Sequence, residues 1–529
     1  MPKFCDIIDA IMFPQKRIYE RKIIMSGEVI AFVLYFVAML GIGVFFFFAS
    51  KSNDEKDYFL GGRRMGPWVT AMSAQASDMS AWLLMGLPGS IIAMGLGQAW
   101  IGIGLAIGTA LNWIIVAKRL RKFSKASGDA ITMPQYLTNR FMAKSSALKI
   151  ICAVVFLISF TIYVASAFSA GAKVFTQLFP NLTVQTAMII FAAIILIYTF
   201  LGGYKAVCWT DFFQGLLMLV ALLAVPIVMI FFGSTDPVLL EQSVTSASGN
   251  EYVFVNSFFA ATPQEIISGL GWGLGYFGMP HIIVRFMSIE KPSMVKKSAT
   301  VAIIWVVITL AATIVMAYVG RMYKPDGVMS FAPMLLEKDS QELIFVELTR
   351  MIFPAFIAGI LLAAIIAASM STADSQLLVA SSSFTSDIYK PIFRKSASDK
   401  ELLWVGRLVV VVVSIVAYFI ASSKGEGAQA IMDMVSNAWA LFGAAFGPVI
   451  LLSLFWKRFT YKGAVAGILA GAIVDIVWLM YLSSTGIYEI IPGFIVCAIV
   501  AVVVSLLDKK PSAEVEAIFA RATNNSIDD

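Results

Sequence analysis

Long apolar runs dominate this chain from one end to the other. Thirteen of them approach the roughly 20 residues that an α-helix needs to cross a bilayer. They lie at approximately 27–49, 67–95, 97–117, 150–174, 184–201, 206–232, 266–286, 299–319, 353–389, 403–421, 430–455, 464–482 and 490–507. The pattern predicts an all-α polytopic membrane protein with about 13 transmembrane helices.

Two of these spans contain residues that a continuous membrane helix tolerates poorly. The second span carries Asp78 among small residues, with Trp82 one turn later. An ionised Asp at a helix centre costs roughly 2.5–3.5 kcal/mol, so Asp78 is expected to be paired or to bind a cation; a hydrogen-bonded packing Asp is the alternative. The seventh span has five Gly between Ser268 and Pro280. These glycines and the proline together disfavour an uninterrupted helix.

The two interrupted spans stand five apart in the order of spans, a pattern that predicts an inverted repeat of five helices plus five. Substrate and ions then bind near the midplane, where the broken helices meet. Trp272 and Tyr276 are four residues apart and add aromatic surface there, although helix packing on glycine would also explain this span. The predicted units are an N-terminal extension (1–26), a first transmembrane helix (27–49), a first repeat (66–232), a second repeat (265–455), two last helices (464–507) and a cytoplasmic tail (508–529).

A third polar patch lies in the ninth span, where Ser371, Thr372, Asp374 and Ser375 follow one another closely. Neutral hydroxyl and carbonyl oxygens suit a monovalent cation, because divalent ions usually recruit more carboxylates. Sodium is therefore the candidate ion. Hydroxyls bonded to the carbonyl one turn back explain any single residue here, but explain the cluster poorly. Asp211, at the start of the sixth span, could face the same cavity.

Composition agrees with a membrane protein and excludes several kinds of chemistry. Hydrophobic residues make up 59% of the 529 positions and charged residues 14%, against roughly 25% charged in soluble domains. One His and four Cys give no metal-site spacing or disulfide framework. The sequence shows no pairing of a nucleophile with a base, so it does not indicate an enzyme. The net charge of +6 does not indicate a nucleic-acid partner, since most Lys and Arg lie in short loops and set membrane orientation.

The basic loops predict which way the chain crosses the membrane. They follow the third, seventh, ninth and eleventh spans, at 118–144, 291–297, 390–400 and 457–462, whereas 233–264 has no Lys or Arg. The basic side is expected to be cytoplasmic, which places the amino terminus outside and the carboxyl tail inside. Residues 1–26 are more basic than expected for a tail outside the cell, because basic segments normally stay on the cytoplasmic side. Met25 directly precedes the first span, so a wrongly assigned upstream start and a real extension both remain open.

Four runs resemble the solute:sodium symporter family. They are Asp57-Tyr-Phe-Leu-Gly-Gly-Arg63, Ala76-Ser-Asp-Met-Ser80, Gly271-Trp-Gly-Leu-Gly-Tyr-Phe-Gly278 followed by Pro280-His281, and Ala438-Trp-Ala-Leu-Phe-Gly-Ala-Ala-Phe-Gly-Pro448. The resemblance extends from Met25 to Ser512 and is strongest to bacterial members that carry proline. It implies a LeuT-like fold.

The resemblance also assigns roles to individual positions. It implies sodium ligands at Ala76, Met79, Ala368, Ser371 and Thr372, with Asp78 needed for sodium dependence. It implies a proline pocket of Trp82, Tyr163, Trp272, Tyr276 and Pro280, and a cytoplasmic coupling residue, Arg63. Asp211, Asp374 and Ser375 form a hypothetical second sodium site; the alternative is that Asp374 is protonated or hydrogen-bonded within the helix bundle. The chain departs from some proline carriers at Ala81, where Gly is found, and at Asp374, where a small neutral residue is found.

The function that the resemblance implies is sodium-coupled uptake of L-proline across the cytoplasmic membrane by alternating access, carried out by a monomer. A sodium symporter for another amino acid, pantothenate or a sugar is the main alternative. A sensor built on the same fold would need a long soluble extension, whereas 22 residues follow Leu507.

Overall fold

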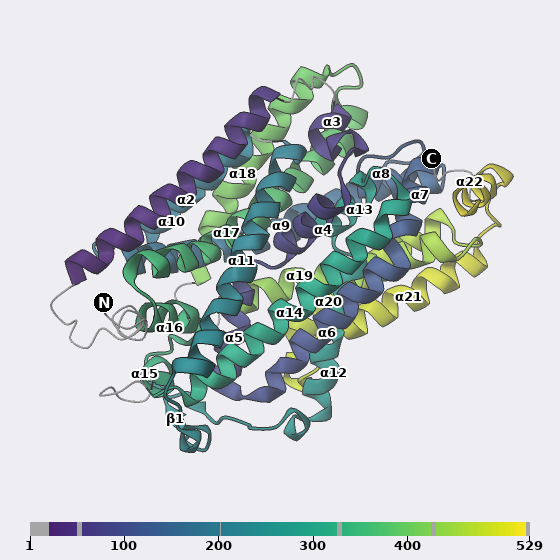
Figure 1. Cartoon of the computed structure of the whole chain (residues 1–529). Coiled ribbons are helices and arrows are strands. Elements are labelled where there is room, and N and C mark those ends of the chain that lie inside the picture. Colours follow the sequence, from purple (N-terminus) through teal and green to yellow (C-terminus); the bar gives the residue numbers. More distant parts are fainter. Residues whose placement is uncertain (1–20, 50–54, 202, 325–330, 425–429, 525–529) are drawn as a thin grey trace.

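The computed structural model describes residues 21–49, 55–201, 203–324, 331–424 and 430–524, and most of them are helical (Figure 1). The strands β1 (Val244–Thr245) and β2 (Glu251–Tyr252) pair antiparallel in one connecting segment. The part of the predicted N-terminal extension at 1–20 lies outside the described residues. The helices begin with α2 (Arg21–Ala49), which starts six residues before the predicted first span.

The helices of the first half are α3 (Glu55–Leu60), α4 (Pro67–Asp78), α5 (Gly86–Met94), α6 (Ala99–Leu111), α7 (Lys118–Ala126), α8 (Met133–Arg140), α9 (Ala147–Leu178), α10 (Val184–Leu201) and α11 (Tyr204–Phe232). Those of the second half are α12 (Pro263–Gly271), α13 (Pro280–Ser288), α14 (Val295–Met322), α15 (Phe331–Leu336), α16 (Ile344–Ile352), α17 (Ala355–Ser382), α18 (Asp399–Lys424), α19 (Ala430–Phe455), α20 (Tyr461–Tyr481), α21 (Ile490–Leu507) and α22 (Ala513–Thr523). Short helical turns used below are η1 (Gly61–Arg63), η2 (Ala81–Leu83), η7 (Trp272–Phe277) and η8 (Pro292–Met294).

Ten helical segments in the described part of the chain are long and apolar enough to cross a membrane. Three further predicted spans correspond to α10 and to the two interrupted segments, α4–η2–α5 and α12–η7–α13. Large apolar side chains are exposed along the outer helices, such as Val412 on α18, Ile473 on α20 and Ile499 on α21. An exposed apolar face on this scale is what a bilayer requires, so the chain is a multi-pass membrane protein.

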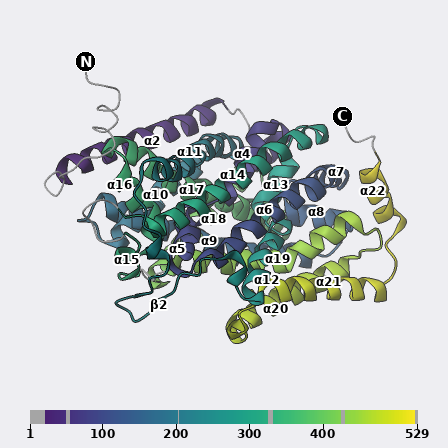
Figure 2. The ribbon, with the colours of Figure 1, turned by 60° about the horizontal axis from the view of Figure 1, so that its bottom comes forward.

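The interrupted segments lie inside the bundle. α4 packs against α11, α13, α14 and α17, while α17 also contacts α2 and α9. α19 packs against α9, α20 and α21. α20 and α21 form one edge of the molecule (Figures 1 and 2). The outer helices therefore separate α4 and α13 from the surroundings of the bundle.

The two ends of the bundle differ in the segments they carry. α7, α8 and α22 lie at one end, and β1, α12 and α15 lie at the other (Figure 1). This separates the basic loop at 118–144 from the loop at 233–264, as the sequence predicts. Which end faces the cytoplasm stays a prediction from the charges.

Candidate functional site

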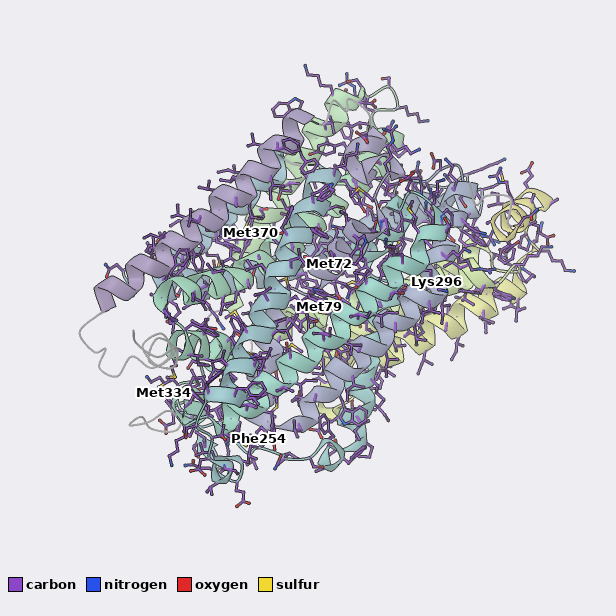
Figure 3. The ribbon with its side chains drawn as sticks, viewed as in Figure 1. Met72, Met79, Phe254, Lys296, Met334 and Met370 are labelled. Carbon is purple, nitrogen blue, oxygen red and sulfur yellow. The ribbon has the colours of Figure 1, made fainter. Side chains whose placement is uncertain are left out.

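The first interrupted segment loses its helical geometry at Asp78. α4 ends there because Met79, with φ −81° and ψ 78°, leaves the helical region. The chain then forms the turn η2 before α5 begins at Gly86. Met79 lies near the centre of the bundle (Figure 3). Main-chain carbonyls around this break no longer belong to one continuous helix, so they can accept other partners.

The second interrupted segment passes through the turn η7 between α12 and α13, and α13 begins at Pro280. Close packing explains its glycines. A Cβ at Gly273 would lie 2.4 Å from the carbonyl oxygen of Gly104, and one at Gly275 would lie 2.0 Å from Nε1 of Trp439. Both distances are far below contact, so side chains here would push α6 and α19 away.

The two interrupted segments meet at Asp78. The Tyr276 hydroxyl donates to Asp78 Oδ2 at 2.5 Å. The main-chain oxygen of Asp78 accepts from Trp82 Nε1 at 3.3 Å and from the Tyr163 hydroxyl at 3.4 Å. All four side chains are buried. The structure thus brings together three of the five predicted pocket residues with the carboxylate predicted for sodium dependence.

The other two predicted pocket residues flank this centre along the same segment. Trp272, at the start of η7, stacks on Tyr488 with ring centroids 5.0 Å apart, and its carbonyl oxygen accepts from Trp439 Nε1 at 2.8 Å. Pro280 is the first residue of α13. The next residue, His281, lies edge-on to Tyr163 with ring centroids 6.5 Å apart. The amino end of α13 is therefore close to the aromatic residues around Asp78.

The predicted sodium ligands come from α4 and α17. Ser371 Oγ donates to the Ala76 carbonyl oxygen at 2.7 Å and to the Ala368 carbonyl oxygen at 3.2 Å. Thr372 Oγ1 is buried and has no hydrogen-bond partner among the described residues. Oδ1 of Asp78, two residues after Ala76 on the chain, is likewise buried without a hydrogen-bond partner among the described residues.

These residues fit a small monovalent cation. The contacts join two carbonyl oxygens and a hydroxyl, and a second hydroxyl follows Ser371 directly on α17. Burying a hydroxyl without a hydrogen-bond partner costs its desolvation free energy. A bound ligand that contacts the hydroxyl would offset this cost. Mostly neutral oxygens beside one carboxylate are a donor set for sodium and are poor in charge for calcium.

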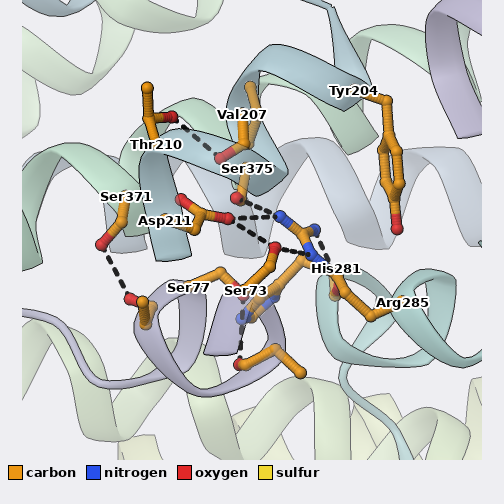
Figure 4. A network of polar contacts seen from close by, with 12 residues as sticks. Ser73, Ser77, Tyr204, Val207, Thr210, Asp211, His281, Arg285, Ser371 and Ser375 are labelled. Atoms are coloured by element: carbon orange, nitrogen blue, oxygen red, sulfur yellow. Dashed lines mark hydrogen bonds and ion pairs between the residues drawn. The ribbon is translucent and has the colours of Figure 1, made fainter. Parts of the chain in front are cut away.

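A second polar cluster surrounds Arg285, which is fully buried on α13 (Figure 4). Its Nη2 lies 3.1 Å from Asp211 Oδ2 on α11 and 2.5 Å from Ser375 Oγ on α17. Its Nε donates to Ser73 Oγ on α4 at 3.1 Å, and Ser73 Oγ donates to Asp211 at 2.6 Å. One guanidinium thus joins four helices and supplies the positive charge that Asp211 needs inside the bundle.

This arrangement changes the hypothesis of a second sodium. Two of its three predicted ligands, Asp211 and Ser375, already bind Arg285. Asp374 is fully buried, and neither of its carboxylate oxygens has a hydrogen-bond partner among the described residues. Any second cation would therefore depend mainly on Asp374.

Arg63 lies in η1, at the end of the bundle that carries α7. It donates to the main-chain oxygens of Met287 at 2.5 Å and Ala130 at 2.6 Å, and to Ser124 Oγ at 3.1 Å. Its Nε lies 2.8 Å from Asp129 Oδ1. Arg63 therefore ties the segment before α4 to α7, to the loop after it and to α13.

Sequence reasoning missed residues that complete both clusters. Arg285 sits at the end of its predicted span, where a long basic side chain is expected to reach the membrane surface. Trp439 lies within one of the four runs that resemble the family, so the sequence did contain a signal for it. Asn112, whose Nδ2 donates to the Tyr276 carbonyl oxygen at 2.9 Å, and Tyr488 carry no signal in the sequence.

Comparison with known proteins settles the family. The sodium:solute symporter family profile matches residues 58–471. The chain belongs to this family. Its members include the sodium/proline symporter of Escherichia coli K12, 44% identical over 505 residues that cover 94% of this chain and 97% of that protein. The osmoregulated proline transporter OpuE of Bacillus subtilis 168 is 41% identical over 493 residues, covering 92% and 96%.

A solved structure shares the fold. A Na⁺-coupled sialic acid symporter, in a substrate-bound outward-open state, aligns with a TM-score of 0.71 over 92% of this chain and 99% of that chain, at 20% identity. The predicted fold class, an all-α polytopic protein with a LeuT-like repeat of five helices plus five, is thereby confirmed. The repeat boundaries and the number of thirteen spans stay predictions.

Proposed function

We propose that this protein couples the entry of sodium to the uptake of L-proline across the cytoplasmic membrane by alternating access. The relatives that share more than 40% of its residues, over more than nine-tenths of its length, are named as proline carriers. The observation that carries the proposal is the convergence of Trp82, Tyr163 and Tyr276 on Asp78, directly beside the oxygen cluster of Ala76 and Ser371.

In this proposal the sodium site consists of the carbonyl oxygens of Ala76, Met79 and Ala368 and the hydroxyls of Ser371 and Thr372. Bound there, sodium would supply positive charge between α4 and α17. Ser371 would then turn its hydroxyl proton away from the Ala76 carbonyl, so that both oxygens face the ion. Asp78 stands beside this cluster and stabilises a nearby positive charge through its carboxylate.

Proline is a compact apolar ring that carries an ammonium-type nitrogen and a carboxylate. The aromatic side chains of Trp82, Tyr163, Trp272 and Tyr276 offer walls for the ring. The amino end of α13, at Pro280, offers main-chain N–H groups and a positive dipole end for the carboxylate. Because Tyr276 binds Asp78, a change at the ion site reaches the aromatic wall through one hydrogen bond.

Coupling requires that sodium bind the two arrangements of the transporter with different affinity, since equal binding would shift nothing. α4 offers a physical link. Its carboxyl end forms the Asp78 site, and the segment before its amino end carries Arg63, which is hydrogen-bonded to the loop after α7. The proposal places that end and the carboxyl tail in the cytoplasm and the amino terminus outside. It takes the carrier to be a monomer.

The direct test is uptake of radiolabelled L-proline by purified protein in proteoliposomes with an imposed inward sodium gradient. We expect accumulation with sodium, and none when the same gradient is made with potassium or choline. Competition by other amino acids, pantothenate and sugars identifies the solute. If proline neither accumulates nor competes while another solute does, the protein is a sodium symporter of that solute.

A further inference from the structure

A hollow of about 740 Å³ opens at the α7 end of the bundle, away from the Asp78 site. Segments distant in sequence form it: the α3–η1 segment, α7 with the loop after it, the segment around η8, and α22. Its lining includes six cationic residues, Lys56, Arg63, Arg121, Lys125, Lys291 and Arg521, and two acidic ones, Asp129 and Glu290. The lining therefore carries four more positive than negative charges.

Asp129 is the acid that pairs with this cluster, and several cations share it. It accepts a hydrogen bond from Lys56, and its Oδ1 lies 2.8 Å from Arg63 Nε and 3.6 Å from Lys125 Nζ. Burial alone would raise the pKa of Asp129, but the Lys56 hydrogen bond and the charges of Arg63, Lys56 and Lys125 outweigh it and lower the pKa. Asp129 is thus ionised near neutral pH, and its carboxylate is shared between Arg63, Lys56 and Lys125.

The other three cations, Arg121, Lys291 and Arg521, form no ion pair with the described residues. Arg121 donates to the main-chain oxygens of Ile289 at 2.6 Å and Glu290 at 2.9 Å, and Arg521 donates to the Ala126 carbonyl. These carbonyls fix the two guanidinium groups without cancelling their charge. The Lys291 side chain forms no hydrogen bond or ion pair with the described residues, and its carbonyl oxygen accepts from Met294 N.

The buried guanidinium groups show that the positive potential reaches the inner wall. Arg63 and Arg121 are each only about one-twentieth exposed. Burial lowers the pKa of Arg63 to about 10, and the charge of Arg121 acts in the same direction, against Asp129. Holding two buried guanidinium groups beside further cations costs free energy unless an anion enters the hollow.

We propose that this hollow binds a phosphate-bearing anion. Guanidinium groups match phosphate oxygens with paired N–H donors, and the excess of positive charge favours an anion with more than one charge. Either an anionic lipid headgroup or a soluble phosphate would provide this chemistry. Because Arg521 lies on α22 and Lys291 precedes η8, the bound anion joins both segments to the loop that Arg63 holds, and so stabilises the packing of these segments against one another.

Lys291→Ala is the primary test, because it removes a side chain with no hydrogen bond or ion pair to the described residues and keeps the carbonyl that accepts from Met294 N. Lys296→Ala is the matched control: Lys296 is exposed, lies five residues further along the chain and is not part of the lining (Figure 3). The full-length protein is placed in nanodiscs of neutral phosphatidylcholine. Inorganic phosphate is titrated at constant ionic strength against chloride, and thermal unfolding reports binding. A parallel series contains phosphatidylglycerol.

We expect phosphate or phosphatidylglycerol to raise the unfolding temperature of the wild type and of Lys296→Ala. Lys291→Ala should bind about fivefold more weakly, since one basic residue near an anionic group is worth about 1 kcal/mol. A shift with phosphate in neutral discs identifies a soluble ligand, and a shift with phosphatidylglycerol alone identifies a lipid headgroup. No shift with either, or equal losses in both Lys variants, would overturn the proposal. The outcome does not depend on which solute is transported.

Discussion

Two buried aspartates on neighbouring helices, Asp78 and Asp211, have opposite surroundings. Asp211 is paired with the guanidinium of Arg285 at 3.1 Å and also accepts from Ser73. The carboxylate of Asp78 accepts only the neutral hydroxyl of Tyr276, and one oxygen of each carboxylate has no hydrogen-bond partner in the described chain. Both side chains are completely buried. The protein thus supplies its own cation to Asp211, whereas in the proposed function the charge of Asp78 is compensated by sodium.

The largest effect is expected from Asp78→Asn, which removes the formal charge and keeps the shape. Sodium-stimulated proline uptake should fall about tenfold or more, because at least 1.4 kcal/mol of ion stabilisation is lost. Uptake in proteoliposomes, with the amount of protein in the membrane as reference, measures it. Asp475→Asn on α20 is a matched control, since Asp475 is also buried with an oxygen lacking a hydrogen-bond partner. Unchanged sodium dependence in Asp78→Asn would make Asp78 a structural residue.

Arg285→Gln tests the other half of the comparison. It leaves Asp211 as a buried charge without its partner, so we expect stability to fall by about 3–5 kcal/mol. The double variant Arg285→Gln with Asp211→Asn should recover most of that loss, because no unpaired charge remains. Denaturant unfolding in nanodiscs measures both. If the double variant is as unstable as the single one, Arg285 acts through packing and not through Asp211.

Ser371→Ala and Thr372→Ala each remove one oxygen from the proposed sodium site. The sodium concentration for half-maximal uptake should rise roughly three- to tenfold, the range expected for one lost polar contact. Initial uptake rates across a sodium series at saturating proline measure this. Ser369→Ala, two residues earlier on α17, is the control, because its hydroxyl bonds to the Ile365 carbonyl within the helix. A change confined to proline affinity would contradict the assignment.

Trp272→Ala and Tyr276→Ala should act mainly on the solute. Each removes aromatic wall, so the proline concentration for half-maximal uptake should rise by a factor of about ten. For Trp272→Ala the sodium dependence at saturating proline should stay near that of the wild type. Tyr276→Ala should also shift it modestly, because Asp78 loses its one side-chain hydrogen bond. If both variants raise the sodium concentration for half-maximal uptake by the same factor, Trp272 belongs to the ion site.

The smallest effect is expected at Asp374. With Arg285 already bound to Asp211 and Ser375, we expect one sodium per proline in the wild type and in Asp374→Ser. The reversal potential of proline flux in proteoliposomes measures this ratio. A ratio of two that drops to one on substitution would establish a second sodium at Asp374.

The sequence alone determined that this is a helical membrane protein and which two segments contain the candidate site. Apolar runs of bilayer length leave few alternatives to a helical bundle, and a carboxylate inside such a run must be paired or functional. Asp78 and the glycine-rich run before Pro280 could be recognised for this reason, because both conflict locally with a continuous membrane helix. Their joint position five spans apart predicted that they would meet.

Only the tertiary structure decided which groups complete each carboxylate. Arg285 and Asp211 are 74 residues apart in the chain, and their contact depends on how α13 packs against α4 and α17 while α11 packs alongside. Sequence placed Arg285 at the end of a span, where a long cationic side chain normally reaches water. The same limit applies to Tyr488, which stacks on Trp272 from a loop. Pairings between distant helices are set by packing, because local patterns encode which face of a helix is apolar but not which neighbour that face will meet.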